Sequence, residues 1–366
     1  MGYTLCQKVR GLVPYEPITG SYPVRLDANE SPFDLAKPES FPAPLQKAAA
    51  EALAKLQAAV AAIPFNRYPD PYCTDLRAAF GKRYGIDPAL VTAFNGSDES
   101  LAILCGCMLE TGQKLVLAEP DFSMYRFYGD LYELQVAGWQ KGDDLTIDPD
   151  ALIDFCRAQT ADALLFSNPC NPTGQVLSRE MIRTILTSLP QTLVMVDEAY
   201  MEFADDQSVM DLVTEFDNLI VLKTCSKALG LAGIRLGFTV ACPTLTTALT
   251  AVKSPYNVNA MTQQAGALLL EETALCDGAA EAIRQSRDEL YRQLTETFGS
   301  CEALEKIYPS GANFVFVKAK NPDSIFQTLK KDGIIIRKMG GYLRITAGSE
   351  PENKALIEAL ERAVSL

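Results

Sequence analysis

The stretch Thr224-Cys225-Ser226-Lys227-Ala228-Leu229-Gly230-Leu231-Ala232-Gly233-Ile234-Arg235 decides the fold and the chemistry expected of this chain. It follows an apolar, β-branched run, residues 219–222, which predicts a buried strand. A lysine becomes a nucleophile only if it loses its proton near neutral pH, and desolvation or a nearby cation lowers its pKa. Lys227 has an apolar flank and a candidate cation in Arg235, eight residues downstream.

Two hydroxyls and the same guanidinium accompany this lysine. Thr224, Ser226 and Arg235 could together hold a dianionic phosphate. A lysine beside a phosphate grip is what pyridoxal phosphate (PLP) needs, because the cofactor is carried on a lysine as a Schiff base. The alternative for this stretch, taken alone, is a solvated lysine at the end of a strand.

Length and composition set the frame for the rest. A chain of 366 residues, 48% of them hydrophobic, is expected to form two domains, or one large and one small. No run is long and apolar enough to span a bilayer, and the start lacks the form of a secretory signal, so we expect a cytoplasmic protein. The ten cysteines are scattered through apolar segments, which favours free thiols over disulfides.

The chain contains no histidine. This excludes Ser–His and Cys–His nucleophile pairs and histidine-based metal centres, so Lys, Tyr, Asp or Glu must carry any acid–base chemistry. The formal net charge of −13 argues against nucleic acid or an anionic membrane as a partner. An anionic ligand would have to be captured by local arginines.

Strand and helix signals alternate through the middle of the chain. Residues 1–33 look irregular, and helices are expected at 43–62 and 74–84. The expected strands are 90–94, 114–118, 164–167, 192–196, 219–222 and 235–241, with helices between most of them. Such alternation predicts a mostly parallel sheet with helices on both faces.

The pattern changes after about residue 255. The expected elements are a helical region at 261–298, a strand at 313–317, a helix at 322–331, strands at 334–337 and 342–346, and a helix at 350–364. We therefore predict a large α/β domain over 34–254, and a small α+β domain formed by 255–366 together with an N-terminal arm, residues 1–33.

Four polar motifs fall at the carboxyl ends of expected strands, where ligands of parallel sheets gather. They are Gly96-Ser97-Asp98, residues 168–174, residues 197–200, and Ser226-Lys227. The free N–H groups of Ser97 and Asp98 would open a helix and form an anion site. The alternative is an ordinary capping box made by Ser97 and Ser100.

Asp197 ends an apolar strand, and a buried carboxylate there is costly unless it is paired. A protonated pyridine nitrogen would pair it and would keep the cofactor ring an electron sink. Tyr200 and Asn171 are placed to reach the ring oxygen. The alternatives are a helix cap for Asp197 and a turn residue for Asn171.

Taken together, these motifs identify a family resemblance. The sequence resembles the fold-type I, PLP-dependent aminotransferases of class I/II, and within them most resembles the histidinol-phosphate aminotransferases. The resemblance runs in order over nearly the whole chain, through residues 66–71, 96–99, 168–174, 196–200, 226–235 and 344–348. It implies a mostly parallel seven-stranded sheet between helices, with a smaller α+β domain.

The resemblance also implies roles around the cofactor. Lys227 is the Schiff-base lysine and then the proton shuttle, Asp197 holds the pyridine nitrogen, and Tyr200 and Asn171 hold the ring oxygen. An aromatic ring at Phe122 stacks on the cofactor, and Tyr125 stands where some relatives keep a histidine behind the aspartate. The phosphate is held by the backbone amides of Ser97 and Asp98 and by Thr224, Ser226 and Arg235.

Two further implications concern the partner and the substrate. Tyr68 resembles the residue that reaches the phosphate from a neighbouring subunit, so a homodimer with shared sites is expected. Arg344 and Asn171 resemble residues that bind the substrate, with Arg337 and Tyr15 holding a substrate phosphate. For Arg337 the alternative is a surface ion pair.

The activity implied is amino transfer between L-histidinol phosphate and 2-oxoglutarate, in histidine biosynthesis. An aromatic amino-acid aminotransferase and a threonine-phosphate decarboxylase on the same scaffold are the alternatives. A PLP-fold transcriptional regulator is disfavoured, because the chain has neither room nor a basic patch for a DNA-binding domain.

Overall fold

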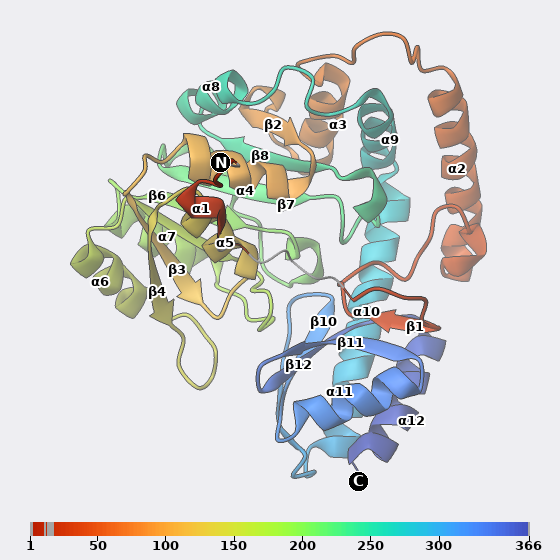
Figure 1. Cartoon of the computed structure of the whole chain (residues 1–366). Coiled ribbons are helices and arrows are strands. Elements are labelled where there is room, and N and C mark those ends of the chain that lie inside the picture. Colours follow the sequence, from red (N-terminus) through yellow and green to blue (C-terminus); the bar gives the residue numbers. More distant parts are fainter. Residues whose placement is uncertain (1–2, 11, 13–17, 365–366) are drawn as a thin grey trace.

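Two β-sheets, connected through one long helix, organise the protein (Figure 1). The computed structural model describes residues 3–10, 12 and 18–364. Tyr15, expected to help bind the substrate, lies outside the described residues. The first described element is a single turn, α1 (Gln7–Arg10).

The larger sheet has seven strands in the order β2-β8-β7-β6-β5-β3-β4. Their bounds are β2 (Val91–Phe94), β3 (Lys114–Glu119), β4 (Gln135–Gln140), β5 (Ala163–Ser167), β6 (Leu193–Asp197), β7 (Leu219–Thr224) and β8 (Gly237–Ala241). All neighbours are parallel except that β8 runs antiparallel to both β2 and β7. The predicted mostly parallel, seven-stranded sheet is confirmed.

The central strands are continuously apolar because both faces of this sheet are covered. Successive side chains of a strand point to opposite faces. On β3, Val116 and Ala118 therefore join one core cluster, while Leu115 and Leu117 join the other. This explains why alternation of polar and apolar residues is absent from these strands.

Helices form a layer on each face (Figure 1). The first core contains side chains of α2 (Gln46–Ala61), α3 (Thr74–Tyr84), α6 (Pro149–Gln159), α7 (Arg179–Ser188) and α9 (Ala260–Glu271). The second contains side chains of α4 (Gly96–Cys107), α5 (Ser123–Leu131) and α8 (Pro243–Val252).

The smaller sheet has five strands in the order β1-β11-β12-β10-β9. Their bounds are β1 (Val24–Leu26), β9 (Leu304–Tyr308), β10 (Phe314–Ala319), β11 (Ile334–Met339) and β12 (Tyr342–Thr346). The helices α11 (Pro322–Lys331) and α12 (Glu350–Val364) contribute to its core. Because β1 pairs in parallel with β11, the segment after residue 23 is built into this sheet.

The helix α10 (Thr273–Phe298) connects the two cores. Leu275 and Ala279 at its start belong to the core of the larger sheet, whereas Leu290 and Leu294 belong to that of the smaller. The core of the larger sheet also contains Val258, just before α9, and Leu269 and Leu270 within α9. These residues lie beyond the predicted end of the large domain. The domain boundary at residue 254 stays a prediction.

Several expected elements have the bounds read from the sequence, among them the helices 74–84, 322–331 and 350–364 and the strand 342–346. The sequence reading missed β1, β4 and β9. β1 has only three residues and follows Pro23, and β4 is half-exposed with a glycine in its middle. The strand expected from residue 235 begins at Gly237, because Arg235 has a left-handed backbone, φ 52°.

Two predictions about the whole chain can be compared with the structure. All ten cysteines are free thiols, as predicted. No helix among the described residues is long and apolar enough to cross a membrane. Those residues also contain no cluster of Cys, Asp or Glu able to hold a metal ion.

Candidate active site

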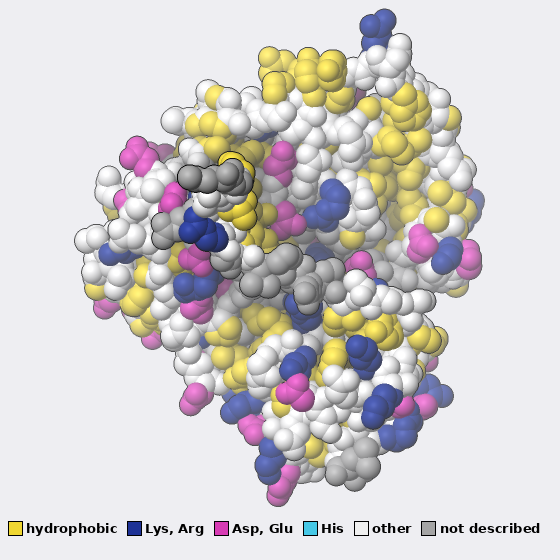
Figure 2. Space-filling view, in the orientation of Figure 1, with side chains coloured by type: hydrophobic (Ala, Val, Ile, Leu, Met, Phe, Trp, Pro, Cys, Tyr) yellow, Lys and Arg dark blue, Asp and Glu magenta, His cyan; other side chains and the backbone are white. Residues whose placement is uncertain are grey.

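A cleft of about 580 Å³ lies between the two sheets, at the carboxyl ends of β5, β6 and β7. Figure 2 shows the side-chain types on one face of the molecule, in the orientation of Figure 1. Twelve of the predicted site residues line this cleft: Ser97, Asp98, Phe122, Asn171, Asp197, Tyr200, Thr224, Ser226, Lys227, Arg235, Arg337 and Arg344. The structure therefore brings together residues that are far apart in the sequence.

Lys227 projects into this cleft from the loop after β7. Its Nζ donates a hydrogen bond to the backbone oxygen of Ala28 at 2.8 Å and lies 6.0 Å from the centre of the Tyr200 ring. The pKa of Lys227 is lowered to about 8, mainly because the amine is desolvated and secondly because the positive charge of Arg344 is near. The expected cation Arg235 also contributes, but less than Arg344. The amine therefore titrates much closer to physiological pH than a solvated lysine does.

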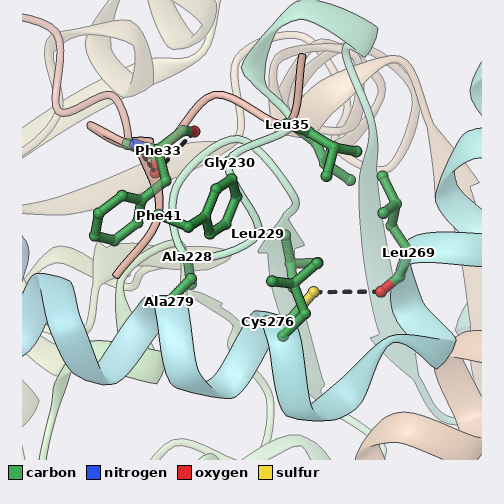
Figure 3. A pocket seen from close by; sticks show the side chains of 12 residues that line it. Phe33, Leu35, Phe41, Ala228, Leu229, Gly230, Leu269, Cys276 and Ala279 are labelled. Carbon is green, nitrogen blue, oxygen red and sulfur yellow. Dashed lines mark hydrogen bonds between the residues drawn. The ribbon is translucent and has the colours of Figure 1, made fainter. Parts of the chain in front are cut away.

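An apolar pocket supports the loop that follows Lys227 (Figure 3). Residues 228–231 line it together with Phe33 and Phe41, whose rings stack with centroids 5.3 Å apart. Cys276 of α10 closes the other side and donates its thiol hydrogen to the backbone oxygen of Leu269 at 3.3 Å. This packing gives the lysine loop a fixed backing rather than a solvated surface.

The predicted anion site is formed by the start of α4 and the end of β7. The Oγ of Thr224 lies 3.0 Å from that of Ser226, and Arg235 Nη1 donates to Ser226 Oγ at 3.4 Å. Arg235 Nη2 also donates to the Asp98 carboxylate at 3.1 Å. Backbone amides at a helix start and a guanidinium are donors suited to a phosphate.

Two glycines allow these groups to approach one another. A Cβ at Gly96 would lie 2.8 Å from Arg235 Nη2, and a Cβ at Gly237 would lie 2.6 Å from the backbone nitrogen of Ser97. The expected alternative, a Ser97–Ser100 capping box, is wrong. Asn95 is the N-cap residue, and its backbone N–H donates to Glu99 at 2.6 Å.

Asp197 lies at the bottom of the cleft, 4% exposed. Its Oδ2 accepts a hydrogen bond from the Tyr125 hydroxyl at 2.8 Å, and its Oδ1 accepts one from the backbone N–H of Ala199 at 3.1 Å. Burial raises the pKa of Asp197 to about 6, and these hydrogen bonds oppose the rise. Tyr125 therefore does stand behind the aspartate, as the resemblance implied.

On the opposite wall, Arg344 of β12 faces the carboxyl ends of the larger sheet. Its Nη1 donates to Asn171 Oδ1 at 2.5 Å, and its Nη2 donates to the backbone oxygen of Asp27 at 2.8 Å. Arg337 of β11 is directly paired with Arg344 in the sheet register. Two guanidinium groups thus line one end of the cleft.

Residues 27–29 complete the site, and the sequence reading did not assign them a role. The backbone oxygens of Asp27 and Ala28 accept hydrogen bonds from Arg344 and Lys227, and Asn29 Nδ2 donates to the Tyr200 hydroxyl at 2.9 Å. These residues were expected only to belong to an irregular N-terminal arm, residues 1–33. The missing signal was β1, which directly precedes them and pairs with β11.

Of the two aromatic residues predicted beside the cofactor, Tyr68 lies away from this chain's cleft and Phe122 lines it. Tyr68 is 80% exposed and stacks on Tyr256 with ring centroids 4.5 Å apart, away from this chain's own cleft. Phe122 lines the cleft and packs edge-to-face on Tyr125, with ring centroids 5.5 Å apart. An aromatic ring therefore lines the cleft, and its stacking on the cofactor stays a prediction.

The donor set fits pyridoxal phosphate. A glycine-lined cradle with a guanidinium suits a phosphate, and a buried carboxylate suits a protonated ring nitrogen. Two polar side chains, Tyr200 and Asn171, suit the ring oxygen, and a partly neutral lysine suits the aldehyde. No described group in the cleft conflicts with this assignment, since the Asp98 carboxylate at the phosphate end is paired with Arg235.

The fold and this site define a PLP-dependent aminotransferase, and the comparison with known families agrees. Residues 23–360 match the family model "Aminotransferase class I and II", and the chain belongs to this family.

Individual relatives share nearly the full length. Histidinol-phosphate aminotransferase of Clostridium kluyveri is 34% identical over 361 residues, which are 97% of each chain. That of Thermococcus gammatolerans is 34% identical over 362 residues, 98% of this chain and 96% of the relative. The crystal structure of histidinol-phosphate aminotransferase from Sinorhizobium meliloti in complex with pyridoxal-5'-phosphate has a TM-score of 0.82. It is 25% identical and covers 94% of this chain and 92% of its own.

Proposed function

We propose that this aminotransferase transfers an amino group between L-histidinol phosphate and 2-oxoglutarate. The observation that carries the proposal is the cross-strand pair Arg337 and Arg344 at one end of the cleft that contains Lys227. A substrate with a phosphate needs more cationic groups than a carboxylate does, and paired guanidinium groups bind oxyanions through two N–H donors each. The names of the similar proteins support the same substrate. Histidine biosynthesis and a cytoplasmic location stay predictions.

In this proposal each polar group around the cofactor has one task. Asp197 would pair with the ring nitrogen, Tyr200 and Asn171 would hold the ring oxygen, and Phe122 would supply the aromatic ring beside the cofactor. The phosphate is held by the first amides of α4, at Ser97 and Asp98, and by Thr224, Ser226 and Arg235. When bound, the cofactor supplies the electron sink that makes the α-carbon of the substrate acidic.

Lys227 does the chemical work of the chain itself. With the cofactor bound, its amine would hold the aldehyde; once free, it would be the base that takes the proton from the substrate's α-carbon and the acid that gives the proton back. Burial and Arg344 lower its pKa to about 8, which makes the amine a usable base near neutral pH. Arg344 holds the anionic end of the substrate and so places the α-carbon near Lys227.

The test is a comparison of amino donors with 2-oxoglutarate as the acceptor. We expect kcat/KM to be highest with histidinol phosphate, lower with phenylalanine, and no carbon dioxide release from threonine phosphate. Arg337→Ala should lower kcat/KM for histidinol phosphate by about 10–150-fold, the equivalent of ~1.5–3 kcal/mol for a charge-assisted contact. The same variant should lower kcat/KM for 2-oxoglutarate much less.

Arg25→Ala is the matched control, because Arg25 is a second arginine that lines the cleft, and it is held by Asp27 at 3.3 Å. Its effect should be small for every substrate. Equal effects of Arg337→Ala on phenylalanine and histidinol phosphate would contradict phosphate recognition and favour the aromatic aminotransferase. Carbon dioxide release from threonine phosphate would favour the decarboxylase.

We also propose a homodimer in which Tyr68 reaches the cofactor phosphate of a second copy. Figure 2 shows hydrophobic side chains gathered over α2 and α9. The large hydrophobic residues exposed on and near these helices are Phe65, Tyr68, Tyr72, Tyr256 and Met261. An exposed group of this kind favours association with another protein surface.

Mixing two inactive variants tests the sharing of sites. Tyr68→Phe and Lys227→Ala should each be impaired alone. After unfolding and refolding together, heterodimers should contain one site with both changes and one with neither, and should recover activity toward half of the wild-type value. Sedimentation must first show that dimers form. Heterodimers without recovered activity would return Tyr68 to a role within its own chain.

A further inference from the structure

Asn29 joins the smaller sheet to the hydroxyl of Tyr200. Its side chain is buried, and its Nδ2 donates to the Tyr200 hydroxyl at 2.9 Å. Its Oδ1 accepts from Thr346 Oγ1 of β12 at 3.1 Å. Its backbone is held as well: the N–H donates to Thr346 Oγ1 at 3.0 Å, and the oxygen accepts from Asn313 Nδ2 at 3.1 Å. Asn29 is therefore held by four hydrogen bonds to three residues.

The orientation of this amide follows from counting donors and acceptors. A threonine hydroxyl has a single proton, and Thr346 Oγ1 already accepts the backbone N–H of Asn29. Its proton needs an acceptor, which Asn29 Oδ1 provides. With the amide reversed, that proton would have no acceptor among the hydrogen bonds of the described residues. The amide nitrogen therefore faces Tyr200.

A tyrosine hydroxyl that accepts one hydrogen bond still has its own proton to donate. Among the hydrogen bonds of the described residues, none uses the Tyr200 proton, and Tyr200 lines the cleft. We propose that Asn29 is a positioning residue that fixes the Tyr200 hydroxyl as a hydrogen-bond donor toward the ring oxygen of the cofactor. This rests on the aminotransferase chemistry and is independent of which amino donor is used.

Three charged side chains act on or lie near Tyr200. Arg344 of β12 and Asp197 of β6 act on it with opposite signs, and Lys227 lies 6.0 Å from its ring centre. None of these is a hydrogen-bond partner of the Tyr200 hydroxyl in the described residues, so the Asn29 amide is the contact that orients it. The adjoining residues Asp27 and Ala28 contact Arg344 and Lys227, which places the whole turn against the reacting groups.

Two substitutions of Asn29 change its side-chain amide without straining its backbone. Asn29 has a left-handed backbone, φ 54°, which asparagine, aspartate and glycine tolerate but alanine does not. Asn29→Gly removes the side chain without strain. Asn29→Asp keeps its size and replaces the donor by an acceptor, so that the Tyr200 proton turns away from the cleft.

The first measurement is a spectroscopic pH titration of the protein with PLP bound. A donor to the ring oxygen stabilises its anionic form and lowers the pH at which the lysine-bound cofactor loses its proton. The midpoint of the colour change should rise by about one pH unit in Asn29→Asp, the equivalent of one hydrogen bond, and by less in Asn29→Gly. The second is made without cofactor: the ¹³Cζ signal of Tyr200, identified by its loss in Tyr200→Phe, should move in both variants.

A double-mutant cycle distinguishes orientation from a simple charge effect. In a Tyr200→Phe background the added Asn29→Asp change should shift the midpoint little. A shift of full size in that background, or unchanged midpoints and an unchanged Tyr200 signal in the single variants, would overturn the proposal. If Asn29→Gly fails to fold, Asn29→Asp and Thr346→Val, which removes the proton that orients the amide, give the same two readouts.

Discussion

Tyr125→Phe removes one hydroxyl behind the buried carboxylate of Asp197 and should change how stability depends on pH. A hydrogen bond to a charged group contributes ~1.5–3 kcal/mol, and one pKa unit corresponds to ~1.36 kcal/mol. Loss of this donor should therefore raise the pKa of Asp197 by about one to two units, from about 6 to about 7–8, in the cofactor-free protein.

The sign follows from the number of protons bound in each state. Burial raises the folded pKa of Asp197 above that of the unfolded chain, so the folded state holds the proton longer and its free energy of unfolding falls as pH rises through 6. In Tyr125→Phe this fall should continue to about pH 8. The stability difference between variant and wild type should therefore grow between pH 6 and pH 8, toward ~1.5–3 kcal/mol.

Urea unfolding of the cofactor-free protein at several pH values measures this difference. Tyr132→Phe is the matched control: it lies at the end of the same helix, and its hydroxyl makes no hydrogen bond with the described part of the chain. Its effect on stability should not vary with pH. A Tyr125→Phe effect that is equally independent of pH would refute the hydrogen bond to an ionised Asp197.

Four further outcomes test the roles of single residues. Lys227→Ala should lose turnover by at least 10²–10⁴-fold, roughly the contribution of a general base. Borohydride should fix the cofactor to the peptide containing Lys227; fixation on Lys223, which is paired with Glu202 at 2.7 Å, would contradict the assignment. Asp197→Asn should keep the cofactor but lower kcat, whereas a normal kcat would leave Asp197 a structural role only. Arg344→Ala should raise the pKa of Lys227 above about 8, so the pH midpoint for acylation of this amine in the cofactor-free protein moves upward; an unmoved midpoint would show that burial alone sets it.

Local patterns were sufficient for most of the fold. The helices 74–84 and 322–331 have start and stop signals within their own sequences. The strand 342–346 is rich in the aromatic and β-branched residues that favour strands. β1 and β4 could not be predicted in the same way, because their strand character depends on neighbours. β1 is a strand only because β11 lies beside it, and β4 is a half-exposed edge of the larger sheet.

The site residues that could be predicted are those whose position follows from a single local motif. Asp197 ends one predicted strand and Lys227 lies in the loop after another, and the order of the strands brings them together. Contacts between distant segments were not predictable. Arg344 has a greater effect than Arg235 on the pKa of Lys227, and Asn29 contacts Tyr200 across 171 positions of sequence. Such pairs follow from how the two sheets pack, which no local pattern contains.

The helix α10 has a consequence for how the protein unfolds. Its 26 residues extend about 39 Å, and its two ends are buried in the cores of different sheets. A helix forms cooperatively along its length. Unfolding of one core therefore destabilises α10 as a whole, and with it the helical residues that pack in the other core. The two halves of the molecule should therefore lose their structure in a single calorimetric transition, and the amides of α10 should be among the last to exchange with solvent.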